Sequence, residues 1–147
     1  MIRAATPADV PRLVELGAAM HAESRYARLG YSPQKVERML GMVLERGFLY
    51  VVESDSVVVG GFAGIVEEHW FSGDKVGTDL ALFVEPGRRG GFAAAALVRA
   101  FIAWARERGA VMTDILINTG VRVDETAALF DCLGGLRAGL IYTWEGE

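Results

Sequence analysis

Residues 80–97 are the part of the sequence whose types and spacing point most directly to chemistry. An apolar run ends in a turn rich in Gly and Arg, and this turn opens into an Ala-rich stretch with helical periodicity. The first N–H groups of a helix have no partner within the helix, and the helix dipole is positive there. Gly and Ala keep side chains away from those groups, while Arg88 and Arg89 add charged donors. The pattern predicts an anion site, and we expect its ligand to be a pyrophosphate.

Two common phosphate-binding motifs do not account for this turn. The nucleotide-binding P-loop requires Gly-Lys-Ser/Thr, which does not follow here. The dinucleotide fingerprint requires G-x-G-x-x-G at the start of a doubly wound fold, and neither is present.

The turn resembles the acyl-CoA signature of the GNAT superfamily of N-acetyltransferases, which reads Q/R-x-x-G-x-G/A after a strand that ends V-x-P. Residues 84–86, Val-Glu-Pro, match that strand end. The signature fits residues 88–93. Residues 89–94 also fit its spacing, with Phe92 at the position of the family's middle Gly, so two registers stay open. The resemblance covers nearly the whole chain, because residues 2–9 are similar to the family's opening strand and helix, and residues 129–135 to its late helix.

The resemblance implies that acetyl-CoA binds in a cleft where the strands at 76–84 and 111–118 splay apart. A free backbone N–H near Phe83 or Val84 would bind the pantetheine or polarise the thioester carbonyl, which stabilises a developing oxyanion. The residues expected to contact acetyl-CoA are Leu82, Phe83, Val84, Arg88, Arg89, Gly90, Gly91, Phe92, Ala93, Ala94, Asn118 and Phe130.

A general base is needed because an amine must be neutral to attack a thioester. Glu68 and His69 end one predicted strand, and Asp79 lies in the next. His69 has the intrinsic pKa best suited to neutral pH, and we rank Glu68 and His69 slightly above Asp79. Alternation places Asp79 on the face opposite Leu82 and Val84 unless the strand is bulged. For the acceptor, we expect contacts from Glu67 and from Tyr26, which lies in a region that shapes the acceptor pocket in the family.

One departure from the family pattern concerns Phe130, which stands where many members carry a Tyr that protonates the leaving thiolate. Either another group serves, with Tyr26 and Tyr142 as candidates, or water does, or the thiolate leaves unaided. The fourth possibility is a competing function: an acyl-CoA-binding sensor or assembly module without catalysis.

The composition of the chain limits the number of domains and the kinds of partner that can be expected. The chain has 147 residues, which favours one domain over residues 1–147, and 52% are hydrophobic, which excludes global disorder. A net charge of −4 argues against nucleic acid and favours a neutral or cationic small substrate. The single cysteine, Cys132, is compatible with a reducing cytoplasm, and the two histidines offer no metal-ligand spacing. The sequence shows neither a spanning apolar stretch nor a signal peptide, so we expect no membrane partner.

The periodicity predicts a mixed α/β sheet, mostly antiparallel with one parallel pair, and helices on both faces. Strands are expected at 2–5, 48–53, 57–66, 76–84, 111–118 and 136–144, and helices at 6–17, 32–47, 91–108 and 126–133. Phe92, Phe101 and Trp104 are expected in the core. Ile141, Tyr142 and Trp144 on the last strand could pair with a second copy, so a homodimer is expected.

Together these features predict an N-acetyltransferase that moves an acetyl group from acetyl-CoA to a primary amine of a small molecule or peptide. No nucleophile-plus-base pair indicates a covalent acyl-enzyme, so direct attack in a ternary complex is expected.

Overall fold

The computed structural model describes residues 1–146. Five strands form one sheet: β1 (Ile2–Ala4), β2 (Phe48–Ser54), β3 (Val57–Glu68), β4 (Lys75–Val84) and β5 (Ala110–Asp114). Four helices surround it: α1 (Val10–Glu23), α2 (Pro33–Arg46), α3 (Ala93–Glu107) and α4 (Val123–Cys132). Three single turns of 3-10 helix connect these elements: η1 (Pro7–Asp9), η2 (Arg25–Arg28) and η3 (Pro86–Arg88).

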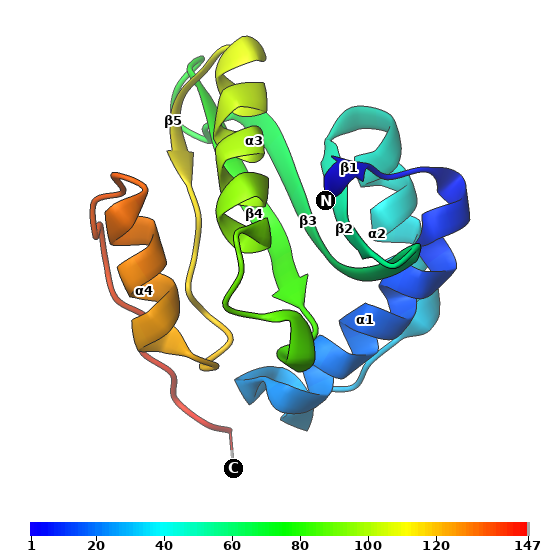
Figure 1. The fold of residues 1–147 in the computed structure, drawn as a ribbon. Coiled ribbons are helices and arrows are strands. Elements are labelled where there is room, and N and C mark those ends of the chain that lie inside the picture. Colours follow the sequence, from blue (N-terminus) through cyan, green and yellow to red (C-terminus); the bar gives the residue numbers. More distant parts are fainter. Residues whose placement is uncertain (147) are drawn as a thin grey trace.

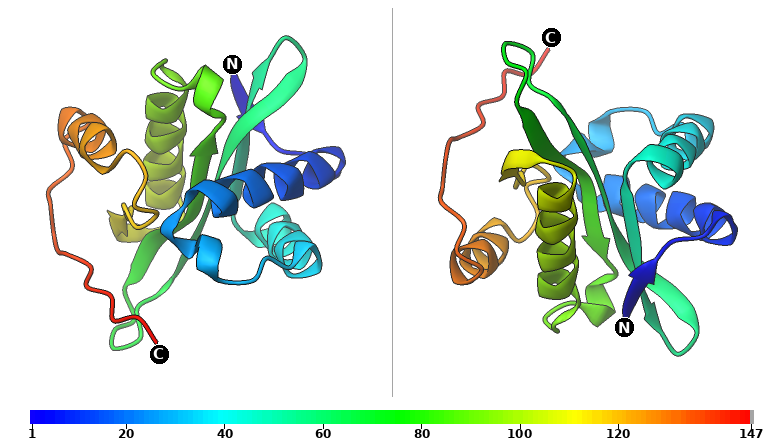
Figure 2. Two further views of the ribbon diagram at one scale, coloured as in Figure 1. Left: turned by 90° about the horizontal axis from the view of Figure 1, so that it is seen from below. Right: turned by 90° about the horizontal axis from the view of Figure 1, so that it is seen from above.

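The sheet has the mixed topology that the sequence predicts. The strands lie in the order β1-β2-β3-β4-β5, and every neighbouring pair is antiparallel except β4 and β5. Helices α1 and α2 cover one face, whereas α3 covers the other with α4 beside it (Figures 1 and 2). The connection from β4 through α3 to β5 is the crossover that a parallel pair requires.

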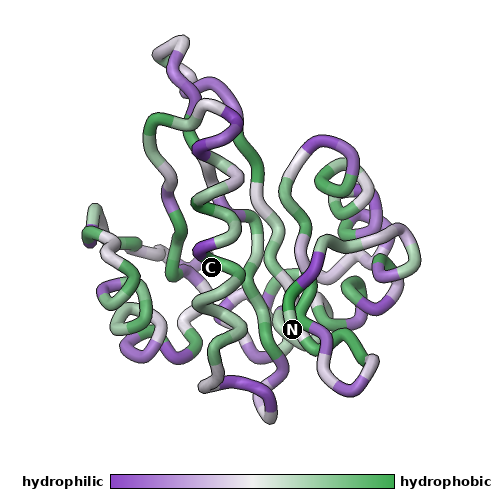
Figure 3. Tube along the Cα trace, turned by 45° about the horizontal axis from the view of Figure 1, so that its top comes forward, coloured by the Kyte–Doolittle hydropathy of each residue, from purple (hydrophilic) through white to green (hydrophobic). Residues whose placement is uncertain are grey.

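Alternation along the strands divides the core into two clusters. On β2, Leu49 and Val51 pack with α1 and α2, whereas Phe48 and Val52 pack with α3. Strands that are buried on both faces read as nearly continuous hydrophobic runs. Figure 3 shows this pattern, with hydrophobic colour along the strands and hydrophilic colour concentrated in the turns.

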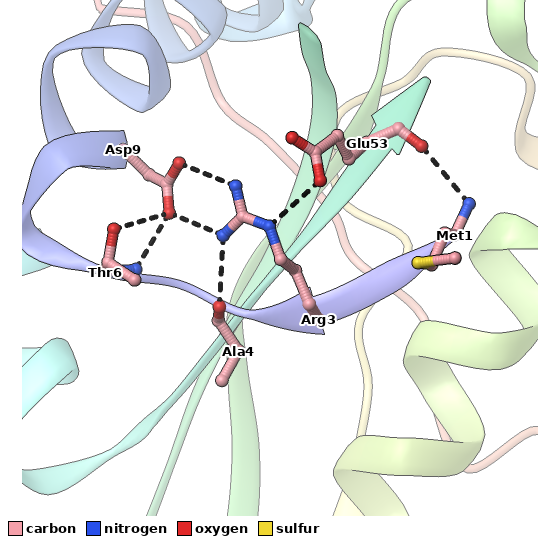
Figure 4. Close-up of polar contacts among 6 residues, drawn as sticks. All are labelled: Met1, Arg3, Ala4, Thr6, Asp9 and Glu53. Atoms are coloured by element: carbon pink, nitrogen blue, oxygen red, sulfur yellow. Dashed lines mark hydrogen bonds and ion pairs between the residues drawn. The ribbon is translucent and has the colours of Figure 1, made fainter. Parts of the chain in front are cut away.

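An ion-pair network anchors the start of the chain to the sheet (Figure 4). Arg3 donates two hydrogen bonds to the Asp9 carboxylate, of 2.8 and 3.0 Å, and one of 3.1 Å to Glu53 on β2. Asp9 also accepts a 2.8 Å hydrogen bond from the backbone N–H of Thr6, which caps the turn before α1. The hydrogen bonds from Arg3 lower the pKa of Asp9 to about 2.

The local start and stop signals read from the sequence are confirmed at α2. The Ser32 hydroxyl accepts a 3.3 Å hydrogen bond from the N–H of Lys35, and Gly47 follows the last helical residue. Among residues 1–146, no helix is long and apolar enough to cross a membrane.

Three expectations about the elements are wrong in detail. The strand expected at 111–118 ends at Asp114, because the backbone there leaves β4 and loses its ladder partner. The strand expected at 136–144 is an extended segment without strand pairing, since no neighbouring strand of this chain lies alongside it. Phe92 is not in the core: it precedes the first residue of α3, outside the buried stripe, and is 91% exposed.

Candidate active site

A cleft opens where β4 and β5 diverge. Their parallel ladder joins residues 75–78 to residues 110–114, and β4 then continues to Val84 without pairing to β5. A cavity of about 600 Å³ lies at this divergence. Its walls come from β4, the turn before α3, the end of α1 with η2, the loop after β5, and α4. The splayed parallel pair is therefore confirmed.

A β-bulge in β4 disturbs the strict alternation at Asp79. Ala63 pairs with Ala81 and Gly64 pairs with Asp79, so Leu80 is the extra residue. Bulges re-aim side chains, and here one oxygen of the Asp79 carboxylate reaches the loop after β5. It accepts a 3.0 Å hydrogen bond from the backbone N–H of Leu116.

The surroundings of Asp79 favour its neutral form. Burial raises the pKa of Asp79 to about 6, and the nearby charge of Asp114 adds to the increase, although the hydrogen bond from Leu116 opposes it. A carboxyl group with this pKa is ionised at neutral pH but is more basic than an exposed aspartate. Asp79 can therefore accept a proton in the cleft.

The backbone of β4 supplies hydrogen-bond donors to the same cleft. Glu85 donates its N–H to the carbonyl of Val59 on β3 at 2.9 Å. Donors alternate between the two sides of an antiparallel strand, so the N–H groups of Leu82 and Val84 face away from β3. They lie on the side from which β5 has diverged, as an oxyanion-stabilising role requires.

The turn before α3 leaves room for an anion. Gly90 has a φ of +86°, a conformation that favours glycine. A Cβ added to Gly87, Gly90 or Gly91 would meet no atom within 4 Å, and no side chain caps the start of α3. The first N–H groups of a 15-residue helix are thus left for a ligand.

The two arginines of this turn point in different directions. The Arg89 guanidinium lies in the cleft, where Nε donates to the Val84 carbonyl at 2.6 Å and the group forms an ion pair with Glu23 of α1. It also lies 5.3 Å from the centre of the Phe83 ring. Arg88 points instead to the β2–β3 turn, 3.4 Å from the Ser54 hydroxyl.

Arg25 of η2 binds the loop after β5 beside the cleft. Its backbone N–H donates to the Thr119 carbonyl at 2.8 Å, and its side chain donates to the Asn118 carbonyl at 2.5 Å and to the Tyr26 hydroxyl at 2.9 Å. These bonds join η2 to the loop after β5. Tyr26 and Asn118 line the cleft, and so does Glu125 on α4.

The structure brings most of the predicted site residues together. Those that line the cleft are Tyr26, Asp79, Leu82, Phe83, Val84, Arg88, Arg89, Gly90, Gly91, Ala93, Ala94, Asn118 and Phe130.

Four predicted residues lie outside the cleft. Glu67 and Glu68 pair with Val76 and Lys75, at the end of β4 where β5 is still its neighbour, and His69 belongs to the turn that follows. The cleft opens at the other end of β4, which explains the separation. Phe92 points away from it, towards a second hollow beside the first residues of the chain.

Sequence reasoning missed several residues of the cleft wall. Glu23 and Leu116 contact Arg89 and Asp79, but their positions follow only from how α1 and the loop after β5 meet. Arg122 also lines the cleft and has a φ of +48°, which no local sequence signal indicates.

Two parallel strands diverge here beside an open glycine turn, and strand N–H groups and a carboxylate face the cleft. This arrangement suits the transfer of an acyl group. Comparison with known proteins gives the same class of enzyme. The acetyltransferase (GNAT) family matches residues 16–130 of the chain. This chain belongs to that family, whose members use acetyl-CoA as co-substrate.

Solved structures share the fold across almost the entire chain. An aminoglycoside 6′-N-acetyltransferase from Acinetobacter haemolyticus superposes with a TM-score of 0.73 at 15% identity, covering 100% of this chain and 98% of its own. A Trypanosoma brucei acetyltransferase gives 0.72 at 15% identity, covering 99% and 98%. An aminoglycoside acetyltransferase from an uncultured soil sample gives 0.71 at 18% identity, covering 100% and 97%. Comparison with curated proteins gives no match in sequence.

Proposed function

We propose that this protein transfers the acetyl group of acetyl-CoA to a primary amine of a small molecule or peptide, with Asp79 as general base. One observation carries the proposal: a single cleft connects the open glycine turn before α3 to the Asp79 carboxylate. The turn suits a diphosphate and the carboxylate suits an amine proton. The thioester of a carrier that spans the cleft would lie between them.

In this proposal, different groups along β4 and the turn after it have different roles. The N–H groups of the turn hold the diphosphate, and those of Leu82 and Val84 face the thioester carbonyl and stabilise the oxyanion. Asp79 takes a proton from the acceptor ammonium, directly or through water, so that the neutral amine attacks. The N–C bond forms, the nitrogen loses its second proton to water as the tetrahedral intermediate collapses, the C–S bond breaks, and CoA leaves as thiolate.

The leaving thiolate needs a proton from a group other than residue 130. Phe130 lines the cleft but has no proton to donate. Tyr26 also lines the cleft and has a hydroxyl, whereas Tyr142 is 74% exposed outside it. Of these two tyrosines, we therefore favour Tyr26, with water as the other source.

Two carboxylates of the cleft wall suit a cationic acceptor, although the whole wall, with three carboxylates and three arginines, is balanced in charge. Glu125 and Asp79 both line the cleft, and Glu23 joins them beside Arg89. Carboxylates raise the local concentration of cations. Aminoglycosides, the substrates named for two of the similar structures, are polyamines and belong in any acceptor panel. We also propose that the protein acts in the cytoplasm, where acetyl-CoA is present and a single cysteine stays reduced.

Two measurements, made one after the other, test this function. Isothermal titration with acetyl-CoA should show binding, and absence of heat at millimolar ligand would reject the diphosphate site. Release of CoA thiol should then be followed with a panel of primary amines, including aminoglycosides, polyamines and peptide N-termini. Tight binding with no thiol released by any amine would instead favour the non-catalytic acyl-CoA sensor.

A further inference from the structure

An ion pair between Arg89 and Glu23 forms part of the cleft wall. Nη1 and Nη2 of Arg89 donate to the two carboxylate oxygens of Glu23, the first of them at 3.5 Å. The side chains of Arg89 and Glu23 are only 17% and 31% exposed. Because Arg89 belongs to the glycine turn and Glu23 to the end of α1, the pair joins the proposed diphosphate site to the helix beside it (Figure 1).

The two sides of the Arg89 guanidinium make different contacts. Nε donates to the Val84 carbonyl at 2.6 Å, and the group lies 5.3 Å from the centre of the Phe83 ring. These contacts fix the guanidinium against β4, while its terminal nitrogens serve Glu23. Phosphate oxygens accept from the same pair of donors that a carboxylate uses. A diphosphate can therefore replace Glu23 on Arg89 without displacing the arginine.

Helix α1 does not by itself explain a glutamate at position 23. Glu23 is the last residue of α1, where the helix dipole is negative and favours cations. A half-buried carboxylate at this position depends on Arg89 to compensate its charge. When a diphosphate takes Arg89, the Glu23 carboxylate is left beside a second anion, and it then needs another cation.

We propose that Glu23 exchanges Arg89 for an ammonium group of the acceptor when acetyl-CoA binds, and that it thereby selects acceptors with at least two amino groups. Glu23 and Asp79 line the same cleft. The attacking amine gives its proton to Asp79 and is neutral, so the cation at Glu23 is a second one. This inference rests on the function proposed above. By thermodynamic linkage, CoA and such an acceptor strengthen each other's binding by the same factor.

Isothermal titration tests whether Glu23 opposes the diphosphate. Glu23→Gln removes the charge but keeps an oxygen that accepts from Arg89, so the Kd for CoA should fall by about 5-fold or more, the lower end of couplings between two sites. Pantetheine lacks the diphosphate, so its affinity should not change. Glu15→Gln is the matched control, because Glu15 also pairs with an arginine on α1, at 3.1 Å, but lies outside the cleft wall. An equal Kd for CoA in the parent and in Glu23→Gln would overturn the exchange.

Steady-state thiol release tests the acceptor side of the exchange. Kanamycin and spermidine carry several amino groups, whereas 1-aminobutane carries one. The parent enzyme should show a higher kcat/KM with kanamycin or spermidine than with 1-aminobutane. Glu23→Gln should raise the KM for the preferred compound by about 5-fold or more and lower the KM for acetyl-CoA. A merely structural role of Glu23 would not move the two KM values in opposite directions.

The results separate this inference from the proposed function. Thiol release with no amine at all would reject the function, and the exchange with it. Release with 1-aminobutane that equals the release with kanamycin and spermidine would leave the function intact and overturn the exchange. Tighter CoA binding by Glu23→Gln with an unchanged KM for the acceptor would also overturn it, because Glu23 would then only oppose the diphosphate.

Discussion

The backbone N–H of Leu116 donates a 3.0 Å hydrogen bond to the carboxylate of Asp79 at the point where β4 and β5 stop pairing. The Asp79 side chain thus accepts a hydrogen bond from the N–H of Leu116, which has no ladder partner because β4 and β5 no longer pair there. The bulge at Leu80 alters the strand alternation at this point, and burial makes the carboxylate more basic. The cleft therefore opens at the same point of β4 that places the carboxylate we propose as the base.

Asp79→Asn should remove the base while keeping the hydrogen bond from Leu116. We expect kcat/KM to fall by about 10²–10⁴-fold, the usual contribution of a general base. In the parent enzyme, kcat/KM should rise with pH through about 6, where Asp79 ionises. This limb should be absent from the pH profile of the variant. A parent profile that is flat between pH 5 and 7 would exclude Asp79 as the base.

The same substitution should stabilise the protein at high pH. The pKa of Asp79 is raised in the folded state, so its ionisation costs stability as pH rises from about 4 to about 6. Asn carries no charge at any of these values. Urea denaturation at pH 5 and pH 8 should therefore show a larger gain for the variant at pH 8. Equal gains at both values would contradict the raised pKa.

Arg89→Ala should weaken acetyl-CoA binding more than Arg88→Ala. Loss of a charged hydrogen bond costs about 1.5–3 kcal/mol, or about 10- to 150-fold in Kd. Arg88 also lines the cleft, but its guanidinium points to the β2–β3 turn, so we expect its loss to cost less. Because Arg89→Ala also leaves Glu23 unpaired near a phosphate ligand, Arg89→Ala/Glu23→Gln should recover part of the loss. An unchanged Kd for Arg89→Ala would move the diphosphate site elsewhere.

Phe130→Tyr should increase kcat by placing a hydroxyl in the cleft, within the about 10²–10⁴-fold range of acid catalysis. Tyr26→Phe should lower kcat if Tyr26 now supplies the proton to the thiolate. The two changes combined should restore activity relative to Tyr26→Phe alone. Steady-state thiol release measures all three variants. A Tyr26→Phe variant with unaltered kcat would leave water as the proton source.

Gly64→Ala should destabilise the fold, whereas Gly41→Ala should not. A Cβ at Gly64 would lie 2.4 Å from the buried Phe101 ring, and overpacking costs about 1–3 kcal/mol. Gly41 lies within α2, where an added Cβ meets no atom within 4 Å, so Ala should stabilise by about 0.5–1 kcal/mol. Thermal unfolding should therefore shift in opposite directions for the two variants. A Gly64→Ala variant as stable as the parent would contradict the packing of α3 on β3.

Acid should weaken the anchor formed by Arg3 and Asp9. The pKa of Asp9 is about 2 in the folded protein and 3.8 in its unperturbed state. Its contribution to stability is thus complete above about pH 4 and is lost as pH falls towards 2. We expect a loss of about 1–2 kcal/mol, discounted for the partial exposure of Arg3. Asp9→Asn should be less stable than the parent at pH 6 and should approach it at pH 2; a constant difference would refute this.

Local signals in the sequence predicted the helix starts, the alternating strands and the open turn at Gly90 and Gly91. Caps, turns and periodicity act between residues a few positions apart, so one sequence is enough to read them. The turn that we propose as the diphosphate site was predictable for the same reason, because strand, turn and helix follow one another directly in the chain.

The tertiary structure decided which of the candidate bases lies in the cleft. The sequence ranked His69 and Glu68 above Asp79 by chemical type, but a bulge opposite Ala63 and Gly64 and the divergence of β5 place Asp79 in the cleft and leave the other two outside. Leu116 contacts Asp79 from 37 residues away in the chain, and Glu23 contacts Arg89 from 66 residues away. Such contacts depend on where two strands cease to pair and how a helix crosses them, and no local pattern encodes that geometry.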